Sequence, residues 1–186
     1  MLAVKPDRRV ERTRRAILDA FRHLILTQGY DPISVRDVVE AAGVGRSTFY
    51  EHFEDKDDLF QESLRPLLSV LAHAVDDGAA EPMLAMVIEH FGHNRRLART
   101  MMAGSPRRLM SRFLAELIEE RLSALARGTH ATRPLIALPL IAIHLAEAQL
   151  GLIGAWLSAK PACAPEALAH ALQLSTHASA AALMRR

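Results

Sequence analysis

The sequence has a single cysteine, Cys163, among its 186 residues. One thiol excludes an intramolecular disulfide framework and is typical of a protein kept in a reducing cytoplasm. Aromatic residues are also scarce, at 5% of the chain, and six of the nine lie within the first sixty residues. The rest of the sequence is aliphatic and rich in alanine and leucine, which favours helices over sheets. We therefore expect an all-α protein that resides in the cytoplasm.

The motifs of common enzyme and cofactor sites are lacking too. The sequence shows no phosphate-binding glycine loop, no nucleophile elbow and no paired cysteines. The one pattern that could suggest a metal is His90 and His93 beside Glu89, but no further ligand set lies near it in the sequence, and its spacing alone is a weak zinc signal. We expect no enzyme activity, no metal and no cofactor.

The segment 134–156 is apolar and long enough to span a membrane. His144, Glu147 and Gln149 lie near its middle, however, and a central acidic side chain costs about 2.5–3.5 kcal/mol on insertion. A buried helix with one polar seam therefore explains the segment better than a membrane span. His144 and Glu147, three residues apart, are candidate ligand-contacting groups in a pocket, or they form a buried pair whose members satisfy each other.

Residues 34–53 have the pattern of two short helices joined by a tight turn. Ser34 is a good N-cap for the first helix, and Gly43 can take the positive φ angle that ends it. The second helix is expected from about Arg46 to about Phe53. Its apolar residues Phe49 and Phe53 share one face, because they are four apart. The other side offers hydrogen-bonding groups: Arg46, Ser47, Thr48, Tyr50 and Glu51. This pattern predicts a helix-turn-helix.

Around this motif the sequence resembles the signature of TetR/AcrR-type transcriptional regulators. The resemblance covers about residues 8–62 and rests on Ile17-Leu18, Ala20-Phe21, Gly29-Tyr30, Ile33-Ser34-Val35, Ala42-Gly43-Val44, Ser47-Thr48-Phe49-Tyr50, His52-Phe53, Lys56 and Leu59. It implies a three-helix DNA-binding head with a basic N-terminal arm, residues 1–55, joined by a long helix to a helical regulatory and dimerisation domain, residues 56–186. Within that arm, residues 1–15 hold six basic and two acidic side chains, and we expect the arm to contact phosphates.

The resemblance also implies roles for individual residues. Arg46, Ser47 and Thr48 are expected to reach base edges, with Arg46 suited to a bidentate contact with guanine. Backbone contacts are expected from Tyr50, His52, Lys56, Ser34 and Arg36. Thr13 is either a phosphate contact or an ordinary solvent-facing threonine, and Tyr50 and His52 have the alternative of simple packing. Glu51 departs from expectation, because an acidic group beside DNA is repelled unless it accepts from a cytosine amine.

Helical periodicity continues through the remaining sequence. We expect a loose arm over residues 1–10 and helices at about 10–28, 56–75, 81–91, 95–102, 106–127, 134–158 and 164–184. Ser105 is the expected N-cap of the fifth of these, and Pro66 is expected to kink or break the second. By resemblance, the last two helices pair with those of a second copy.

The resemblance implies a homodimeric regulator, most simply a repressor, that binds a palindromic double-stranded DNA operator and responds to an unidentified small-molecule effector. One alternative is a co-regulator of the same fold that acts through a protein partner without specific DNA binding. Another is a helical-bundle enzyme, which would need a convergent polar cluster in the body that the sequence does not show.

Overall fold

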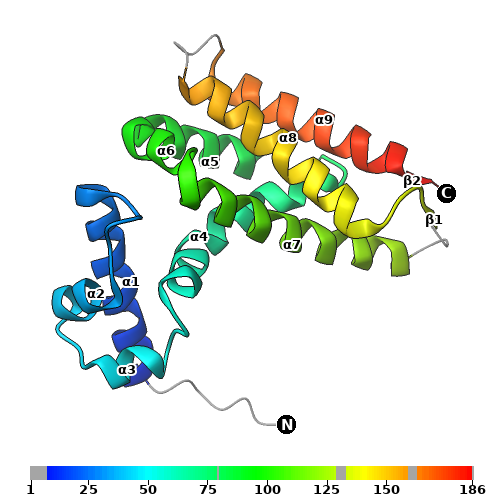
Figure 1. Ribbon diagram of the computed structural model, residues 1–186. Helices are drawn as coiled ribbons and strands as arrows, with labels where there is room; N and C mark the ends of the chain where they lie inside the picture. The colour runs from blue at the N-terminus through cyan, green and yellow to red at the C-terminus, as the bar shows by residue number, and fades with distance from the viewer. Residues whose placement is uncertain (1–7, 79, 129–132, 159–162, 186) are drawn as a thin grey trace. The chain divides into compact units, whose positions relative to one another are not determined.

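The computed structural model describes residues 8–78, 80–128, 133–158 and 163–185. Helices dominate these residues, and the β-structure among them is a two-residue antiparallel ladder (Figure 1). The expected all-α fold is therefore confirmed. The chain forms two compact units, Met1–Leu64 and Arg65–Arg186, which we call the head and the body. Their boundary falls inside helix α4 (Lys56–Ala72), whereas the sequence placed a functional boundary between residues 55 and 56; that functional division remains a prediction.

The head is built from α1 (Arg8–Gln28), α2 (Val35–Ala42), α3 (Arg46–Tyr50) and the start of α4. Each helix turns apolar side chains toward a common centre. The buried residues are Ile17, Leu18, Phe21, Ile25, Tyr30, Ile33, Val38, Phe49, Phe53, Leu59 and Phe60. Phe21 meets the rings of Tyr30 and Phe60 edge-on, with centroids 6.4 and 6.5 Å away. This aromatic centre explains why the scarce aromatic residues gather in the first sixty positions.

Local signals set the bounds of α2. The Ser34 hydroxyl accepts from the Asp37 amide, and the Asp37 carboxylate accepts from the Ser34 amide, so the helix opens on a reciprocal capping box. The helix ends at Gly43, whose φ is +66°, and the Val44 amide then donates to the Val39 carbonyl. These two devices satisfy backbone groups that the eight-residue helix leaves without partners.

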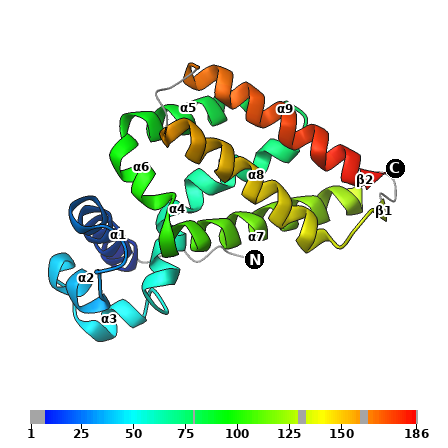
Figure 2. The same ribbon diagram turned by 45° about the horizontal axis from the view of Figure 1, so that its top comes forward.

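The body contains the rest of α4, the 3₁₀ turn η1 (His73–Val75), α5 (Glu81–His93), α6 (Arg95–Met101), α7 (Gly104–Gly128), α8 (Leu138–Ser158) and α9 (Pro165–Leu183). Helix α8 packs along α7, and α9 packs along α5 (Figure 2). The strands β1 (Arg133–Pro134) and β2 (Met184–Arg185) pair antiparallel. They tie the residues before α8 to the end of α9.

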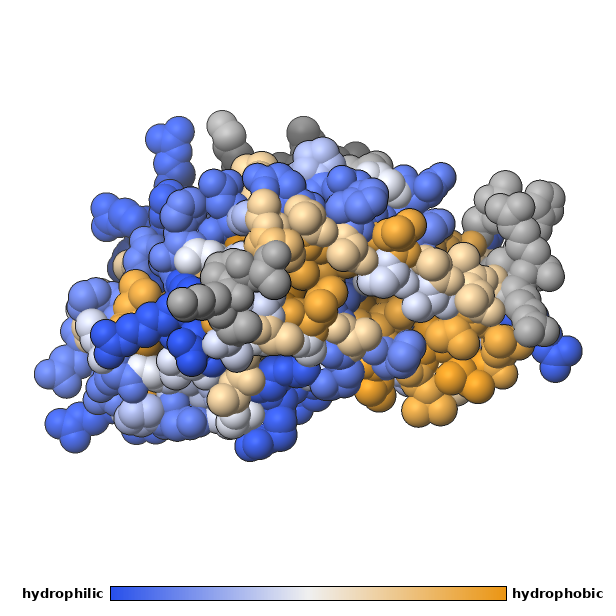
Figure 3. Space-filling model, turned by 90° about the horizontal axis from the view of Figure 1, so that it is seen from above, coloured by the Kyte–Doolittle hydropathy of each residue, from blue (hydrophilic) through white to orange (hydrophobic). Residues whose placement is uncertain are grey.

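Helices α8 and α9 both carry apolar side chains that are exposed to solvent. Leu140, Ile143 and Leu152 on α8 and Leu174 on α9 are large hydrophobic side chains open to solvent, and Figure 3 shows hydrophobic residues gathered in patches on the surface. Helix α8 is also long and apolar enough to cross a membrane by length and composition, but half of its apolar stretch is buried inside the protein. The core helix of a soluble protein can have the same length and composition, so this is weak evidence for a membrane span.

Several expected boundaries are wrong. Residues 8–10 belong to α1 rather than to a loose arm, while residues 1–7 lie outside the described part of the chain. Helix α3 ends at Tyr50 rather than near Phe53, because the next residues form a turn in which the His52 amide donates to Phe49. Helix α8 starts at Leu138 because Pro134 is held in the ladder. Helix α7 starts at Gly104, so Ser105 is not its N-cap, and α4 runs through Pro66 without a break.

The left-handed conformation of Gly43 yields a stability prediction. Gly43→Ala should lower the free energy of unfolding of the head by about 1–2 kcal/mol, because a β-carbon is strained at this φ. Gly43→Asn is the matched control and should cost less, since asparagine tolerates this conformation. Urea unfolding followed by the head's tyrosine fluorescence would measure both. Equal losses for the two variants would contradict the conformational explanation.

Candidate nucleic-acid interface

Helix α3 has one face anchored in the head and one face open to solvent. Phe49 is fully buried, Phe53 just beyond the helix is nearly so, and their ring centroids are 5.7 Å apart. Arg46, Ser47 and Tyr50 are exposed on the other side, and Thr48 is partly exposed. The structure therefore brings together the residues expected at base edges. Glu51, exposed as the C-cap of α3, stays beside them as an acidic group.

Arg46 lies against Tyr50 on this open face. Its Nη2 donates to the Tyr50 hydroxyl at 3.4 Å, and its guanidinium sits 5.7 Å from the centre of the Tyr50 ring. The two residues are four apart, so they are neighbours on the helix surface. Tyr50 is 48% exposed and meets the Phe49 ring edge-on, so the ring has both a packing contact and an open side. The Arg46 fork is held at the surface of α3, where base edges of a major groove would lie.

Lys56 is engaged inside the head. Its ammonium donates to the carbonyl oxygens of Tyr30 and Asp31, at 3.2 and 3.3 Å, and lies 4.3 Å from the centre of the Tyr30 ring. The Tyr30 hydroxyl donates to Asp57, and burial, together with this carboxylate, raises the pKa of Tyr30 above its ordinary value. Lys56 therefore joins the start of α4 to the turn after α1. Sequence reasoning assigned Lys56 to phosphate and missed this structural role.

The remaining candidate DNA contacts of the head are either bonded within the protein or open to solvent. Ser34 donates to Asp37 at 2.7 Å, so its hydroxyl proton is used by the capping box, and these bonds lower the pKa of Asp37. The Thr13 hydroxyl donates to the Arg9 carbonyl at 3.0 Å, the bond of an ordinary helical threonine. Arg36 is exposed, and His52 is partly exposed with its ring 6.4 Å from that of Phe53.

Arg14 in the basic segment also has an internal role. It forms an ion pair with Glu62 at 2.9 Å, and its guanidinium stands 5.4 Å from the centre of the Phe53 ring. The guanidinium of Arg14 stacks on the ring of Phe53, which follows α3. Arg14 thus ties α1 to α4 within the head, a role that charge counting along the sequence cannot distinguish from phosphate binding.

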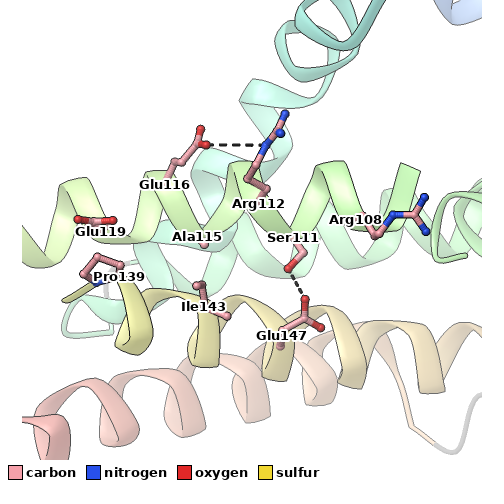
Figure 4. A pocket seen from close by; sticks show the side chains of 9 residues that line it. All are labelled: Arg108, Ser111, Arg112, Ala115, Glu116, Glu119, Pro139, Ile143 and Glu147. Carbon is pink, nitrogen blue, oxygen red and sulfur yellow. Dashed lines mark hydrogen bonds and ion pairs between the residues drawn. The ribbon is translucent and has the colours of Figure 1, made fainter. Parts of the chain in front are cut away.

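The two candidate ligand residues on α8 do not form the buried pair considered from the sequence. His144 is exposed, and Glu147 pairs with Arg107 at 2.7 Å and accepts from Ser111, both on α7. These partners, Ser111 first and then Arg107, lower the pKa of Glu147. Figure 4 shows Ser111 and Glu147 pointing toward one another at an open hollow of about 390 Å³ between α7 and α8. Sequence spacing placed both residues on one helix but could not show which way its faces point.

The histidine pattern on α5 gains no ligands from the fold. Within the part of the chain that the structure describes, no group of three or more histidine, cysteine, aspartate or glutamate side chains is placed to hold a metal ion. His90 lies instead beside Asn94, whose amide nitrogen donates to the His90 carbonyl at 3.0 Å.

Comparison with known proteins agrees with the geometry of the head. Residues 17–63 match the model of the bacterial regulatory proteins of the tetR family. The regulator AcrR of Shigella flexneri is 41% identical over 61 residues, which are 33% of this chain and 28% of AcrR. The repressor AcnR of Corynebacterium glutamicum is 33% identical over 76 residues, 40% of each chain. The chain therefore matches well under half of the length of these curated relatives.

A match over nearly the whole chain comes from a solved structure. A TetR transcriptional regulator from Streptococcus agalactiae has 26% sequence identity and a TM-score of 0.57, with 91% of this chain and 96% of that one covered. The helix-turn-helix head thus matches the tetR family over residues 17–63, and the chain as a whole shares the fold of a TetR transcriptional regulator.

The contacts of Lys56 yield a prediction for the protein without DNA. Lys56→Met keeps an apolar stem over Tyr30 but removes the ammonium, so the head should lose about 1–2 kcal/mol of unfolding free energy. Arg36→Met is the matched control, because it removes an exposed cation and should change stability by less than about 0.5 kcal/mol. Chemical denaturation measures both. If Lys56→Met is as stable as the parent protein, Lys56 has no structural role.

Proposed function

We propose that this protein is a sequence-specific DNA-binding transcriptional regulator that acts as a homodimer. The observation that carries the proposal is the two-sided α3, anchored by Phe49 and presenting Arg46, Ser47 and Tyr50 to solvent. A helix of this kind after a tight glycine turn is the reading element of a helix-turn-helix. The match of residues 17–63 to the tetR family supports the same function, and with it a cytoplasmic regulator rather than an enzyme.

The contacts we propose with DNA fall into two classes. Arg46, with Ser47 and Thr48 beside it, reads base edges in the major groove. Tyr50, Arg36 and His52 hold the sugar-phosphate backbone and fix the register of the head without reading sequence. Lys56 has two of its ammonium protons directed to carbonyl groups, so we assign it a supporting contact with phosphate. Ser34 and Thr13 contribute through the backbone of their helices more than through their hydroxyls.

We propose the exposed apolar side of α8 and α9 as the dimer interface. Leu140 and Leu152 on α8 and Leu174 on α9 are open to solvent, and α9 is rich in alanine. A second copy of the same hairpin offers the same apolar side, which suits the self-complementary contact of a twofold dimer. Two heads would then occupy successive major grooves about 34–36 Å apart on a palindromic operator.

We propose that a small molecule bound in the body regulates DNA binding by the heads. We propose a repressor whose head spacing changes when a small molecule binds the body. The ligand must bind the two states with different affinity, since equal affinity shifts no population. Selection of genomic DNA fragments by the purified protein at two salt concentrations tests the function. One palindromic motif that survives higher salt supports it. Weak, salt-sensitive binding without a motif would leave only phosphate attraction and favour action through a protein partner.

Arg46 is the residue whose loss should relax sequence preference. Arg46→Ala should cost about 1–3 kcal/mol of discrimination at one base pair of each half-site, because a bidentate contact is lost. Arg36→Ala is the control. It should weaken binding to all DNA sequences alike and reduce the slope of log binding constant against log salt concentration by about one. Competition binding with single-base variants of the selected motif separates the two. If Arg46→Ala weakens binding to all of these DNA variants equally, Arg46 does not contact a base edge.

The dimer interface yields a prediction of oligomeric state. Leu174 is 62% exposed on α9, and Leu174→Glu would place two like charges in an apolar interface. We expect the dimer dissociation constant to rise at least about tenfold, which is about 1.4 kcal/mol. Met86→Glu is the control, since Met86 is 68% exposed and lies on a different helix, α5. Analytical ultracentrifugation measures both variants. Dissociation by Met86→Glu alone would put the interface on α5.

A further inference from the structure

The body buries two glutamines that differ in their bonding. Gln173 on α9 is 4% exposed, and its Nε2 donates to the carbonyl oxygens of Ala74 and Asp76, at 3.2 and 2.7 Å, while its Oε1 has no partner among the described residues. Gln149 on α8 is 1% exposed, and neither its Nε2 nor its Oε1 has a hydrogen-bond partner within the described part of the chain. Gln173 therefore has an evident structural role in holding the end of η1. Gln149 has none.

The amide of Gln149 lies in an apolar interior. Its neighbours on the buried face of α8 are Leu145, Leu150 and Ile153, and the helices against which α8 packs contribute Leu, Ile, Val, Phe and Met side chains. Across the described residues of the body, the buried polar side chains are Gln149, Gln173 and Thr176, and none carries a charge. An amide in such surroundings loses its bonds to water and gains none from the protein, which disfavours the folded state.

The helices α6 and α7, against which α8 packs, carry buried methionines. Met101 and Met110 are buried, and Met102 lies near Gly154 of α8, 3.9 Å from where a β-carbon would stand. Methionine side chains are unbranched and polarisable, so they can repack around an added molecule at low cost. An interior with several methionines and an amide that has no partner on either its nitrogen or its oxygen can therefore accommodate a small apolar guest and offer it a hydrogen-bonding group.

We propose that Gln149 is the polar anchor of an effector site inside the body. The effector is an uncharged, largely apolar molecule with one group, such as a hydroxyl, that can both donate to and accept from the amide. Ionic effectors are excluded from this site because a charge buried without a partner costs far more than an unpaired amide. This inference rests on the proposed regulatory function, and it moves the ligand site from His144 and Glu147, which face solvent, to the buried face of the same helix.

The proposal first predicts a stability difference between two matched variants, measured without any ligand. Gln149→Leu removes two unpaired polar atoms and should raise Tm by about 2–8 °C. Gln173→Leu leaves two carbonyls without their donor and should lower Tm by a similar amount. Calorimetry at one fixed protein concentration compares them. If Gln149→Leu lowers Tm as Gln173→Leu does, the amide is already satisfied in the free protein, by water for instance, and the proposal is overturned.

A second measurement tests binding with three probes of similar size: phenol, toluene and benzoate. NMR titration of the wild-type protein should show phenol binding more tightly than toluene, and no binding of benzoate inside the body. Gln149→Leu should raise the dissociation constant of phenol at least about fivefold and leave that of toluene unchanged. Phenol binding equally to wild type and variant, or no phenol binding to wild type, would overturn the proposal.

Failure of this inference can be told from failure of the proposed function. Both measurements use the protein alone, and binding of both glutamine variants to the selected DNA motif is measured separately. If the wild-type protein selects no motif but the glutamine results hold, the regulator proposal fails and the ligand site stands. If the motif is selected but Gln149→Leu behaves as wild type toward phenol, the regulator stands and this effector site falls.

Discussion

The burial of Phe49 and Phe53 determines how the exposed side of α3, with Arg46, Ser47 and Tyr50, is oriented. Helix α3 has five residues, and isolated helices shorter than about 12–15 residues are marginal in water. Its shape is therefore imposed by the core of the head, where each buried phenylalanine contributes about 1.5–3 kcal/mol. Because those two rings point inward, Arg46, Ser47 and Tyr50 point outward. The orientation of the side that we propose to contact DNA is a consequence of hydrophobic packing behind it.

The cations of the head separate into those that hold the fold and those that face solvent. Lys56 and Arg14 bind carbonyl, carboxylate and ring groups of the head itself, while Arg36 and Arg46 lie at its surface. A basic sequence segment therefore overstates the charge that is free to meet DNA. The same division explains why a small net charge is compatible with a DNA-binding surface, since the position of each cation matters more than the total.

Local chemistry made much of the head predictable. Ser34 and Gly43 mark the ends of α2 by their own backbone preferences, and the spacing of Phe49 and Phe53 indicates the buried side of α3. What failed depends on distant residues: α8 starts late because Pro134 pairs with Met184, fifty residues away in the chain. A helix that is apolar nearly all round does not reveal its faces, so the sequence could not show that His144 and Glu147 face outward while Gln149 faces inward. Whether a buried amide has a partner is likewise decided by neighbouring helices.

The central claim is that two copies place their α3 helices in successive major grooves of one DNA site. Hydroxyl-radical footprinting on a fragment selected by the protein measures this most directly. For a dimer bound in this way we expect two equivalent protected regions related by twofold symmetry, with centres about 10–10.5 base pairs apart. A single protected region, or protection without symmetry at any protein concentration, would contradict the claim.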